Sequence, residues 1–463
     1  MCLKHKMNVQ APSILYCILL LIFVQVFLLM TLLTGNVDLG GLRSCVELAE
    51  SMSLVKKRQE QQPLLWSVPG LACEGVIKGD SAAIAKAREW KIDVNAILEA
   101  VLASKNRCTL IAELFAFRTA PLSEEEADFP IAYGILVHKD FIQFLLMLSS
   151  FYHPQNVYCV AVSGGASQSF LRLIHGLPDC FDNVHVIQVD RVRWGSFEII
   201  HSVHKCMSLL DTLKRPDWRY FQYLSGVDVP LRTNLEMVRI LRALNGSINA
   251  EVSNFQQKRL ATKKGKKPPL PLFKSSLSAL LPRAAVHVLV HERKPLVLMG
   301  FLNGTLTPDE SYWATVAGNP QLLQLPGGWN ASEILAARKK NGQGGGRIKP
   351  ARLCSHSPCV SFYYISRFQI WKEHGVCRGM FKSTSCVFGV ADLVSVLRMP
   401  HLVAHKLYLS FEPAALFCAL REIDRRSREP DPLFNHLQYA ELPQVELSRG
   451  VPFTNISHPE WLT

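Results

Sequence analysis

The chain begins with one long apolar run and continues with short apolar segments separated by polar ones. Residues 14–33 form an uninterrupted run of 20 residues without a charge, in which Gln25 and Thr31 are the clearly polar members. As a helix rising ~1.5 Å per residue, this run would span ~30 Å, the thickness of a bilayer core. We therefore predict a transmembrane signal anchor at 14–33, preceded by a cytoplasmic tail at 1–13.

The charges beside the run predict its orientation. Lys4, His5 and Lys6 precede it, so the positive-inside rule places this end in the cytosol and the rest of the chain in a lumen. A cleaved signal peptide is the alternative, but the run is longer than a usual h-region and no small-x-small cleavage site closely follows it. Residues 34–70 show no pattern, and we predict a stem there.

Short apolar strands then alternate with helical segments. The predicted strands are Ile131–Val137, Val157–Val162, Val184–Val189 and Tyr220–Leu224, and the predicted helices are 141–151, 168–174, 197–213 and 234–244. This alternation predicts an α/β fold whose mostly parallel sheet is covered by helices on both faces. Ligands of such sheets bind outside the carboxyl ends of the strands.

Other segments depart from this alternation. Residues 80–102 have a helical composition, residues 258–271 are basic and rich in proline, and residues 339–347 form a low-complexity insertion. We expect the basic stretch to be a solvent-exposed loop, and a lid that faces an anion is the other interpretation. We predict one lumenal domain at 71–425, followed by a C-terminal tail at 426–463.

Composition and charge narrow the class of protein. Hydrophobic residues make up 48% and charged residues 19% of the 463 residues, which excludes a disordered, collagenous or wholly membrane-embedded protein. The 51 Lys and Arg outnumber the 38 Asp and Glu, and the net charge of +13 suggests a nucleic acid, a membrane surface or an anionic small molecule as partner. A lumenal orientation argues against nucleic acid.

Metal-binding and phosphate-binding motifs are scarce. The chain has no Asp-x-Asp pair, which usually holds the metal of a nucleotide-sugar site, and no GxxxxGK[ST] or GxGxxG loop. Two zinc-like clusters, one of His201, His204 and Cys206 and one between Cys354 and Cys359, lack convincing further ligands. In an oxidising lumen the second is better interpreted as a loop disulfide. We therefore predict no metal and no cofactor.

A lumenal chain can form disulfides and carry N-glycans. The 13 cysteines are too sparse for a small disulfide scaffold, and spacing alone cannot select their partners. Four Asn-x-Ser/Thr sequons are predicted glycosylation sites, at Asn245, Asn303, Asn330 and Asn455.

Two segments look unlike generic core. Residues 224–234 (LSGVDVPLRTN) place Asp228 in a glycine turn after a strand and Thr233 where it can cap the next helix. Residues 307–313 (TPDESYW) place Pro308 in a first helical turn, followed by two acidic residues. Taken alone, each segment could be an ordinary turn or helix start.

Together, these segments resemble the core-2/I-branching β-1,6-N-acetylglucosaminyltransferases, a family that also includes the peptide O-xylosyltransferases. The matching stretches are YGILVHKD (133–140), HPQNVYCVAV (153–162), VRWGSFEIIHSVHKCMSLL (192–210), WRYFQYLSGVDVPLRTNLEMVRILRALNG (218–246), TPDESYWATV (307–316), CVFGVADL (386–393) and PHLVAHK (400–406). The resemblance implies a variant of the GT-A glycosyltransferase fold, with a mostly parallel sheet, behind a single N-terminal transmembrane helix.

The resemblance also implies a metal-independent, inverting transfer of a sugar from a UDP-sugar. Glu310 matches the family's general base, which deprotonates the acceptor hydroxyl. Lys406 matches a cation that neutralises the leaving diphosphate. The family's second cation, an arginine, falls at Ser383. The neighbouring Lys382 could substitute for it, although a lysine is not a bidentate clamp.

Further positions follow from the same resemblance. Val137 and Trp194 align with residues near the uridine, and Ser163 replaces an aspartate on the uracil side. Glu251 matches a carboxylate that binds the acceptor sugar, and Arg259 falls where the family has an acceptor-side lysine. The family's disulfides would be Cys73–Cys418, Cys108–Cys180, Cys159–Cys206 and Cys377–Cys386.

We therefore expect a single-pass type II glycosyltransferase of the Golgi membrane, with its catalytic domain in the lumen. The expected reaction is β-linked transfer of GlcNAc from its UDP-sugar to a Gal/GalNAc O-glycan of a glycoprotein. Phe368 and Ile370 fall near the family's aromatic pair under the acceptor, which leaves another glycan or peptide acceptor open. The departures together leave UDP-glucose or UDP-xylose, and a different linkage, open. An inactive lumenal glycan-binding homologue is the alternative that Ser163 and Ser383 favour.

Overall fold

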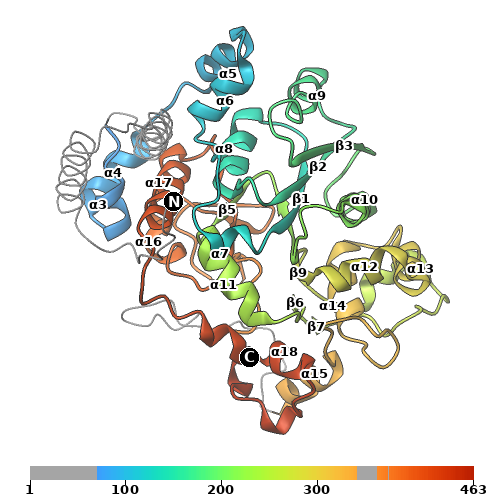
Figure 1. The fold of residues 1–463 in the computed structure, drawn as a ribbon. Helices are drawn as coiled ribbons and strands as arrows, with labels where there is room; N and C mark the ends of the chain where they lie inside the picture. The colour runs from blue at the N-terminus through green and yellow to red at the C-terminus, as the bar shows by residue number, and fades with distance from the viewer. Residues whose placement is uncertain (1–69, 341–361, 374, 463) are drawn as a thin grey trace, which may run out of the picture. The chain divides into compact units, whose positions relative to one another are not determined.

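The computed structural model describes residues 70–340, 362–373 and 375–462 (Figure 1). The predicted cytoplasmic tail, the anchor at 14–33, nearly all of the stem and residues 341–347 of the insertion fall outside these residues. Among the described residues, no helix is both long and apolar enough to cross a membrane. The anchor therefore stays a prediction.

A six-stranded sheet, in the order β3-β2-β1-β4-β9-β6, organises the fold. Its strands are β1 (Ile131–Val137), β2 (Val157–Ser163), β3 (Val184–Val189), β4 (Tyr220–Ser225), β6 (Asn249–Ala250) and β9 (Ala279–Pro282). The strands β1 to β4 are mutually parallel, whereas β9 runs antiparallel to its neighbours β4 and β6. The predicted α/β fold with a mostly parallel sheet is confirmed.

Both faces of the sheet are buried, which explains why its central strands are apolar at nearly every position. Tyr133 and Ile135 of β1 contribute to one hydrophobic core, and Ala132 contributes to the second, because successive side chains of a strand point to opposite faces. Helix α8 (Phe141–Phe151) packs in the first core and α10 (Phe197–Thr212) in the second. Figure 1 shows these two helices on opposite sides of the central strands.

Further helices and three small sheets surround the central sheet. The helices are α3 (Cys73–Lys78), α4 (Ser81–Glu89), α5 (Val94–Ala103), α6 (Arg107–Leu114), α7 (Glu124–Ala127), α9 (Gln168–His175), α11 (Asn234–Leu244), α12 (Arg283–His291), α13 (Arg293–Leu302), α14 (Asp309–Ala317), α15 (Ala331–Lys340), α16 (Leu393–Val396), α17 (Pro413–Arg428) and α18 (Pro443–Ser448). The short 3₁₀ helices are η1 (Gln257–Lys263), η2 (Val390–Asp392), η3 (Leu437–Glu441), η4 (Phe453–Asn455) and η5 (Pro459–Leu462). The paired strands are β5 (Asp228–Pro230) with β12 (Val403–His405), β7 (Ser253–Asn254) with β8 (Phe273–Lys274), and β10 (Met380–Lys382) with β11 (Ser385–Val387).

Two segments differ in detail from the expectation. The helical stretch at 80–102 is divided into α4 and α5, because Trp90 is extended and Asp93 caps a second helix through the N–H of Ala96. The basic stretch at 258–271 is not entirely a loop, since its first residues belong to η1. The reason for the second difference is the side chain of Arg259, which is buried against the start of α14.

The predicted C-terminal tail packs against the domain. The side chain of Gln444 accepts hydrogen bonds from the side chain of Asn249 and from the N–H of Ala250, both in the edge strand β6. Tyr439 is buried and donates its hydroxyl proton to the carbonyl of Pro400. These contacts extend the folded unit beyond residue 425, while the predicted domain boundaries themselves stay predictions.

All four predicted disulfides are present. They are Cys73–Cys418, Cys108–Cys180, Cys159–Cys206 and Cys377–Cys386. Since Cys206 is bonded to Cys159, it offers no thiolate to the zinc-like cluster that contains His201 and His204. The predicted loop disulfide between Cys354 and Cys359 falls outside the described ranges.

The four sequons differ in accessibility. Asn245, Asn303 and Asn455 are exposed, as a glycan acceptor must be. Asn330 is half-buried, and its side-chain oxygen accepts hydrogen bonds from the N–H groups of Ser332 and Glu333 at the start of α15. A glycan on Asn330 would therefore compete with a helix cap.

Candidate active site

The carboxyl ends of the parallel strands form the edge at which ligands of such sheets bind. Strands β1 and β4 are neighbours, but β1 leads through α8 to β2 on one side, whereas β4 lies on the other side. The chain therefore diverges after these two strands, the topological switch point of the sheet. Val137 ends β1, and a Cβ at Gly226, just after β4, would lie 3.1 Å from its Cγ1. The predicted uridine-side Val137 thus stands at the switch point.

The segment after β3 carries Trp194, whose side chain is 79% exposed. Ser163, at the end of β2, anchors this segment, because its hydroxyl accepts hydrogen bonds from the N–H groups of Val192 (3.0 Å) and Gly165 (3.3 Å). Ser163 therefore has a structural task here: it joins the segments that follow β2 and β3.

The same segment also contacts the start of α14. The carbonyl of Gly195 accepts a hydrogen bond of 3.2 Å from the N–H of Thr307. Gly195 has φ +70°, a conformation that favours glycine, and an added Cβ would lie 3.2 Å from Thr307 Cγ2. Trp194 is thereby held beside the helix start that carries Glu310.

Glu310 is the second residue of α14 and is fixed by two cations. Its Oε2 accepts a hydrogen bond of 2.7 Å from Arg259 Nη2 and lies 3.9 Å from Lys274 Nζ. In the described part of the chain, Oε1 accepts no hydrogen bond. The side chain of Glu310 is 17% exposed. One oxygen of the carboxylate is therefore held, and the other is available to an incoming group.

Arg259 uses its whole guanidinium to hold this arrangement. Its Nε donates to the side chain of Gln256 at 3.0 Å, and its Nη1 donates to the carbonyls of Leu306 and Thr307 and contacts the Thr307 hydroxyl. Its side chain is only 7% exposed. This geometry makes Arg259 a positioning partner of Glu310, and its role in acceptor binding stays a prediction.

Asp309, the neighbour of Glu310, is in a different environment. It is buried, and its Oδ1 has no hydrogen-bond partner among the described residues. Burial, together with the charge of Glu310, raises the pKa of Asp309 to about 7. Two adjacent carboxyl groups therefore differ: Glu310 is paired with cations, and Asp309 is held in the interior.

A second group of residues gathers two positive charges. Lys406, just after β12, donates a hydrogen bond of 2.9 Å from Nζ to the carbonyl of Lys382 in β10. The Nζ atoms of Lys382 and Lys406 lie 5.0 Å and 5.7 Å from the centroid of the Tyr408 ring. Burial and the charge of Lys382 lower the pKa of Lys406. No carboxylate of the described residues forms an ion pair with either lysine, which is the environment that a bound anion would complete.

The buried ion pair of Asp228 and Arg367 supports the strand that precedes Lys406. Asp228 accepts hydrogen bonds from Arg367 Nη2 (2.7 Å) and from the N–H of Ser225 (2.8 Å), and its other oxygen lies 2.7 Å from Nδ1 of His405. Burial raises the pKa of Asp228, but the charge of Arg367 and the contacts of His405 and Ser225 more than offset this, and its pKa lies below the usual value. Asp228 belongs to β5 and His405 to β12, and these two strands are paired. Because Lys406 directly follows His405, these contacts support the backbone beside Lys406.

The Glu310 group and the Lys406 group both belong to the carboxyl edge of the sheet. The Gly195 contact joins the first to the segment after β3, and the N–H of Leu407 donates to the carbonyl of Val227, just after β4, at 3.1 Å. Burial raises the pKa of Tyr223 in β4, the charge of Arg367 opposes this effect, and the charges of Asp309 and Asp228 add to it. Tyr223 thus lies within electrostatic reach of both groups.

Several members of these groups were not found from the sequence. Lys274, Tyr408 and Arg367 carry no local motif, because each gains its role from a partner distant in the chain; Arg367 and Asp228 are 139 residues apart. His405 lies in the matching stretch at 400–406, but its contact with Asp228 was not predicted. Glu251, predicted to bind the acceptor, is half-buried and forms no ion pair within the described residues.

Two clusters in the described residues have three groups that could ligate a metal. They are Asp211 with His287 and His291, and Cys377 with Cys386 and Asp392. The two cysteines of the second cluster form a disulfide. Neither cluster contains a residue of the Glu310 or Lys406 groups, and metal independence stays a prediction.

Comparisons with known proteins show what the chain is similar to. Residues 131–338 match the model of the family described as Core-2/I-Branching enzyme. The β-1,3-galactosyl-O-glycosyl-glycoprotein β-1,6-N-acetylglucosaminyltransferase of Homo sapiens is 29% identical over 352 residues, covering 70% of this chain and 76% of that protein. The protein of the same name numbered 3, from Ovis aries, is 29% identical over 385 residues, covering 75% and 80%.

A solved structure of S. aureus TarS, residues 1–349, is also similar in part. It has 12% sequence identity and a TM-score of 0.22, and the match covers 42% of this chain and 62% of that one. A TM-score this low does not establish a shared fold.

Proposed function

We propose that the chain is a glycosyltransferase of the core-2/I-branching family, and that it transfers GlcNAc from UDP-GlcNAc to a Gal/GalNAc O-glycan of a glycoprotein. The transfer is β-linked, inverts the anomeric carbon and uses no metal. The enzyme is a type II protein of the Golgi membrane with a GT-A-like domain in the lumen. The names of the two relatives support this donor and acceptor, because both are β-1,6-N-acetylglucosaminyltransferases for β-1,3-galactosyl-O-glycosyl-glycoprotein.

The observation that best supports the proposal is the carboxylate of Glu310, whose two oxygens are in different environments. Arg259 and Lys274 hold Oε2, and Oε1 is left to accept a proton. The acceptor hydroxyl donates to Oε1 and its oxygen attacks the anomeric carbon from the face opposite UDP. The new C–O bond forms as the bond to the diphosphate breaks, and the hydroxyl proton passes to Glu310.

In the proposed reaction, the lysine pair stabilises the leaving group. The departing diphosphate gains negative charge, and a preorganised cation stabilises this charge most where water is excluded. Lys406 is buried, and Lys382 shares the Tyr408 ring with it. Two ammonium groups without a carboxylate partner among the described residues can therefore replace the metal ion that other nucleotide-sugar enzymes use. Trp194 and Val137 would border the uridine at the same edge.

Two features support other candidate functions. Departures from the family pattern, such as Ser383 in place of an arginine, leave UDP-xylose or UDP-glucose as the alternative donor. Ser163, together with Ser383, favours an inactive glycan-binding homologue.

A donor screen tests these candidates. The purified full chain is incubated with UDP-GlcNAc, UDP-Glc, UDP-Gal or UDP-Xyl and a Gal/GalNAc O-glycan, with and without EDTA, and the product is identified by mass spectrometry. We expect transfer from UDP-GlcNAc that survives EDTA and is lost in Glu310→Gln. Complete loss in EDTA with rescue by Mn²⁺ would refute metal independence. UDP binding without transfer from any donor would favour the inactive homologue.

A further inference from the structure

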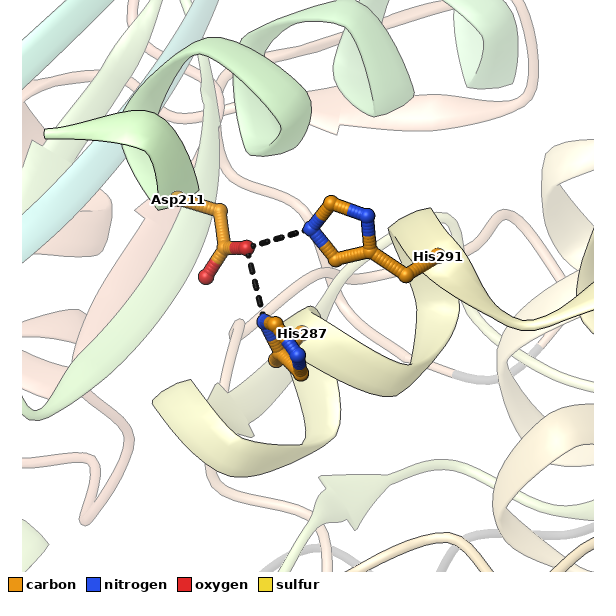
Figure 2. Close-up of side chains that lie close together, drawn as sticks. All are labelled: Asp211, His287 and His291. Atoms are coloured by element: carbon orange, nitrogen blue, oxygen red, sulfur yellow. Dashed lines mark hydrogen bonds and ion pairs between the residues drawn. The ribbon is translucent and has the colours of Figure 1, made fainter.

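Asp211, His287 and His291 form a cluster that the proposed reaction does not use (Figure 2). Asp211 lies near the end of α10, and the two histidines lie one turn apart on α12. Oδ2 of Asp211 is 3.0 Å from Nδ1 of His287 and 2.9 Å from Nε2 of His291. Figure 2 shows both imidazoles turned toward this one carboxylate.

The three side chains have the chemistry of a zinc site. Histidines at positions i and i+4 present two imidazole nitrogens on one face of a helix, and a carboxylate oxygen is the third common ligand of Zn²⁺. The three ligand atoms lie within 4.8 Å of one another. Ligands at ~2.0–2.1 Å from a tetrahedral ion are separated by ~3.3 Å, so the observed distances of 2.9 and 3.0 Å need to open by only a few tenths of an ångström.

We propose that Asp211, His287 and His291 bind one Zn²⁺ ion, with water as the fourth ligand, and that the ion links α10 to α12. The side chains of His287 and His291 are 65% and 57% exposed, so an ion can enter from solvent.

Burial of the carboxylate supports the same assignment. The side chain of Asp211 is only 7% exposed, and a carboxylate removed from water needs a positive partner. Among the residues that the structure describes, His287 and His291 alone lie within ion-pairing distance of Asp211. An imidazole is positive only when it is protonated, whereas a bound divalent ion supplies the charge at any pH at which the imidazoles are free to bind.

The zinc site is separate from the proposed reaction centre. Helix α10 runs from Phe197, which follows the Trp194 segment, to Thr212. At ~1.5 Å per residue, Asp211 lies ~20 Å along the helix from Phe197. The ion would therefore stabilise the packing of α10 on α12 and take no part in sugar transfer.

Zinc binding by the full chain tests the proposal. The protein is stripped with EDTA, freed of the chelator and titrated with ZnCl₂ in competition with a chromogenic chelator, while Tm is followed in parallel. We expect one equivalent of bound zinc and a Tm rise of roughly 2 °C or more. His291→Ala and His287→Ala should each weaken zinc affinity more than ~100-fold, since loss of even an outer-shell partner typically costs 10–100-fold. Each should also abolish the Tm rise.

The controls separate this site from adventitious binding. His175→Ala changes an exposed histidine on another helix, α9, and should leave zinc binding unchanged. Mg²⁺, which prefers oxygen ligands, should not raise Tm. Co²⁺ should give the absorption bands of a tetrahedral site in the parent chain and lose them in His291→Ala. Zinc bound equally well by the parent and by His291→Ala, or no zinc bound by the parent, would overturn the proposal.

Discussion

At the residue scale, the proposed reaction gives Glu310 and Lys406 separable tasks, so their variants should fail in different ways. Glu310→Gln keeps the shape of the side chain but removes the proton acceptor. We expect kcat to fall ~10²–10⁴-fold, the usual contribution of a general base, with the Kd of UDP nearly unchanged. Lys406→Ala should first weaken UDP binding, because its ammonium belongs to the lysine pair that is proposed to bind the diphosphate. Steady-state kinetics and calorimetric titration with UDP measure the two effects.

Two matched variants control this comparison. Lys258→Ala removes an exposed lysine next to Arg259 and should change neither kcat nor UDP affinity. Asp309→Asn should retain turnover, because the Asp309 side chain is buried rather than presented to an acceptor. An inactive Asp309→Asn beside a normal Glu310→Gln would assign the base to Asp309 instead.

Asp309 also predicts a pH dependence of stability. Its pKa is about 7 in the folded chain, raised first by burial, against an ordinary value of 3.8. Between these values the folded state holds a proton that the unfolded state has lost, so the contribution of Asp309 to stability is full below pH ~4 and is lost as the pH rises to ~7. Asp309→Asn removes this titration. Urea unfolding at pH 5 and pH 8 should show the variant gaining a few kcal/mol relative to the parent at the higher pH.

An exposed carboxyl provides the comparison for this effect. Asp128→Asn, at the end of α7, should follow the parent at both pH values. If Asp309→Asn also follows the parent at both pH values, the pKa of Asp309 does not differ between the folded and unfolded states, contrary to what its burial implies.

Single residues were predictable where a resemblance or a local rule identified them, and not where a distant partner does. Glu310 and Lys406 came from aligned motifs, and Thr233 came from its position before a helix. Lys274 and Arg367 could not be found, because nothing in the adjacent sequence shows that the chain brings them to Glu310 and Asp228. The buried state of Asp309 was equally hidden, since an acidic residue in a first helical turn is ordinarily a solvated one.

At the element scale, helix starts differ in how many contacts their caps make. Thr233 begins α11 with a reciprocal capping box, in which Glu236 also pairs with Arg426 of α17. Ser167 begins α9, and its hydroxyl accepts a hydrogen bond of 3.2 Å from the N–H of Phe170 and lies 3.0 Å from the hydroxyl of Ser169, without a reciprocal bond or an ion pair to another helix in the described structure. We expect Thr233→Ala to cost ~1–2 kcal/mol and Ser167→Ala about half as much, measured by urea unfolding. Equal losses would show that the pairing across to α17 adds nothing to the cap.

The elements of the sheet were predictable because β1 to β4 are apolar runs of a length typical of strands, separated by amphipathic helices. The short strands were not. β5 and β12 have three residues each, and their register pairs Asp228 with His405, which stand 177 residues apart. A three-residue segment has no periodicity of its own, so its pairing depends on the packing of the surrounding chain. This is why the contact between Asp228 and His405, which supports the lysine pair, could be found only from the structure.

At the scale of the whole molecule, the fold class could be predicted from the sequence, but the way in which the C-terminal part of the chain completes the fold could not. The parallel strands and their covering helices were expected, whereas the antiparallel edge of β9 and β6 and its contact with Gln444 were not. The C-terminal residues add buried apolar side chains to both cores, Leu442 and Val445 to one and Leu462 to the other. They also satisfy buried polar groups of the edge strand.

The disulfides let the stability of the whole molecule be separated from the geometry of its active site. Cys73–Cys418 closes a loop with a sequence separation of 345, and Cys377–Cys386 closes one of 9. A cross-link restricts the unfolded chain more when its loop is longer. Cys73→Ser/Cys418→Ser should therefore lose up to about 5 kcal/mol of stability and Cys377→Ser/Cys386→Ser about 2–3 kcal/mol, measured by denaturant unfolding.

The short loop should nevertheless matter more for the donor. Cys377–Cys386 braces the hairpin of β10 and β11, whose Lys382 carbonyl accepts the hydrogen bond of Lys406. Its removal frees the hairpin and separates the two ammonium groups, so the KM for the UDP-sugar should rise while kcat changes little. Cys108→Ser/Cys180→Ser, with a separation of 72 and no contact with either lysine, is the matched control and should leave KM unchanged. An equal rise of KM in all three double variants would trace the effect to general instability. An unchanged KM in Cys377→Ser/Cys386→Ser would mean that Lys406 holds its position without the hairpin, and that the pairing of β5 with β12 alone builds the anion site.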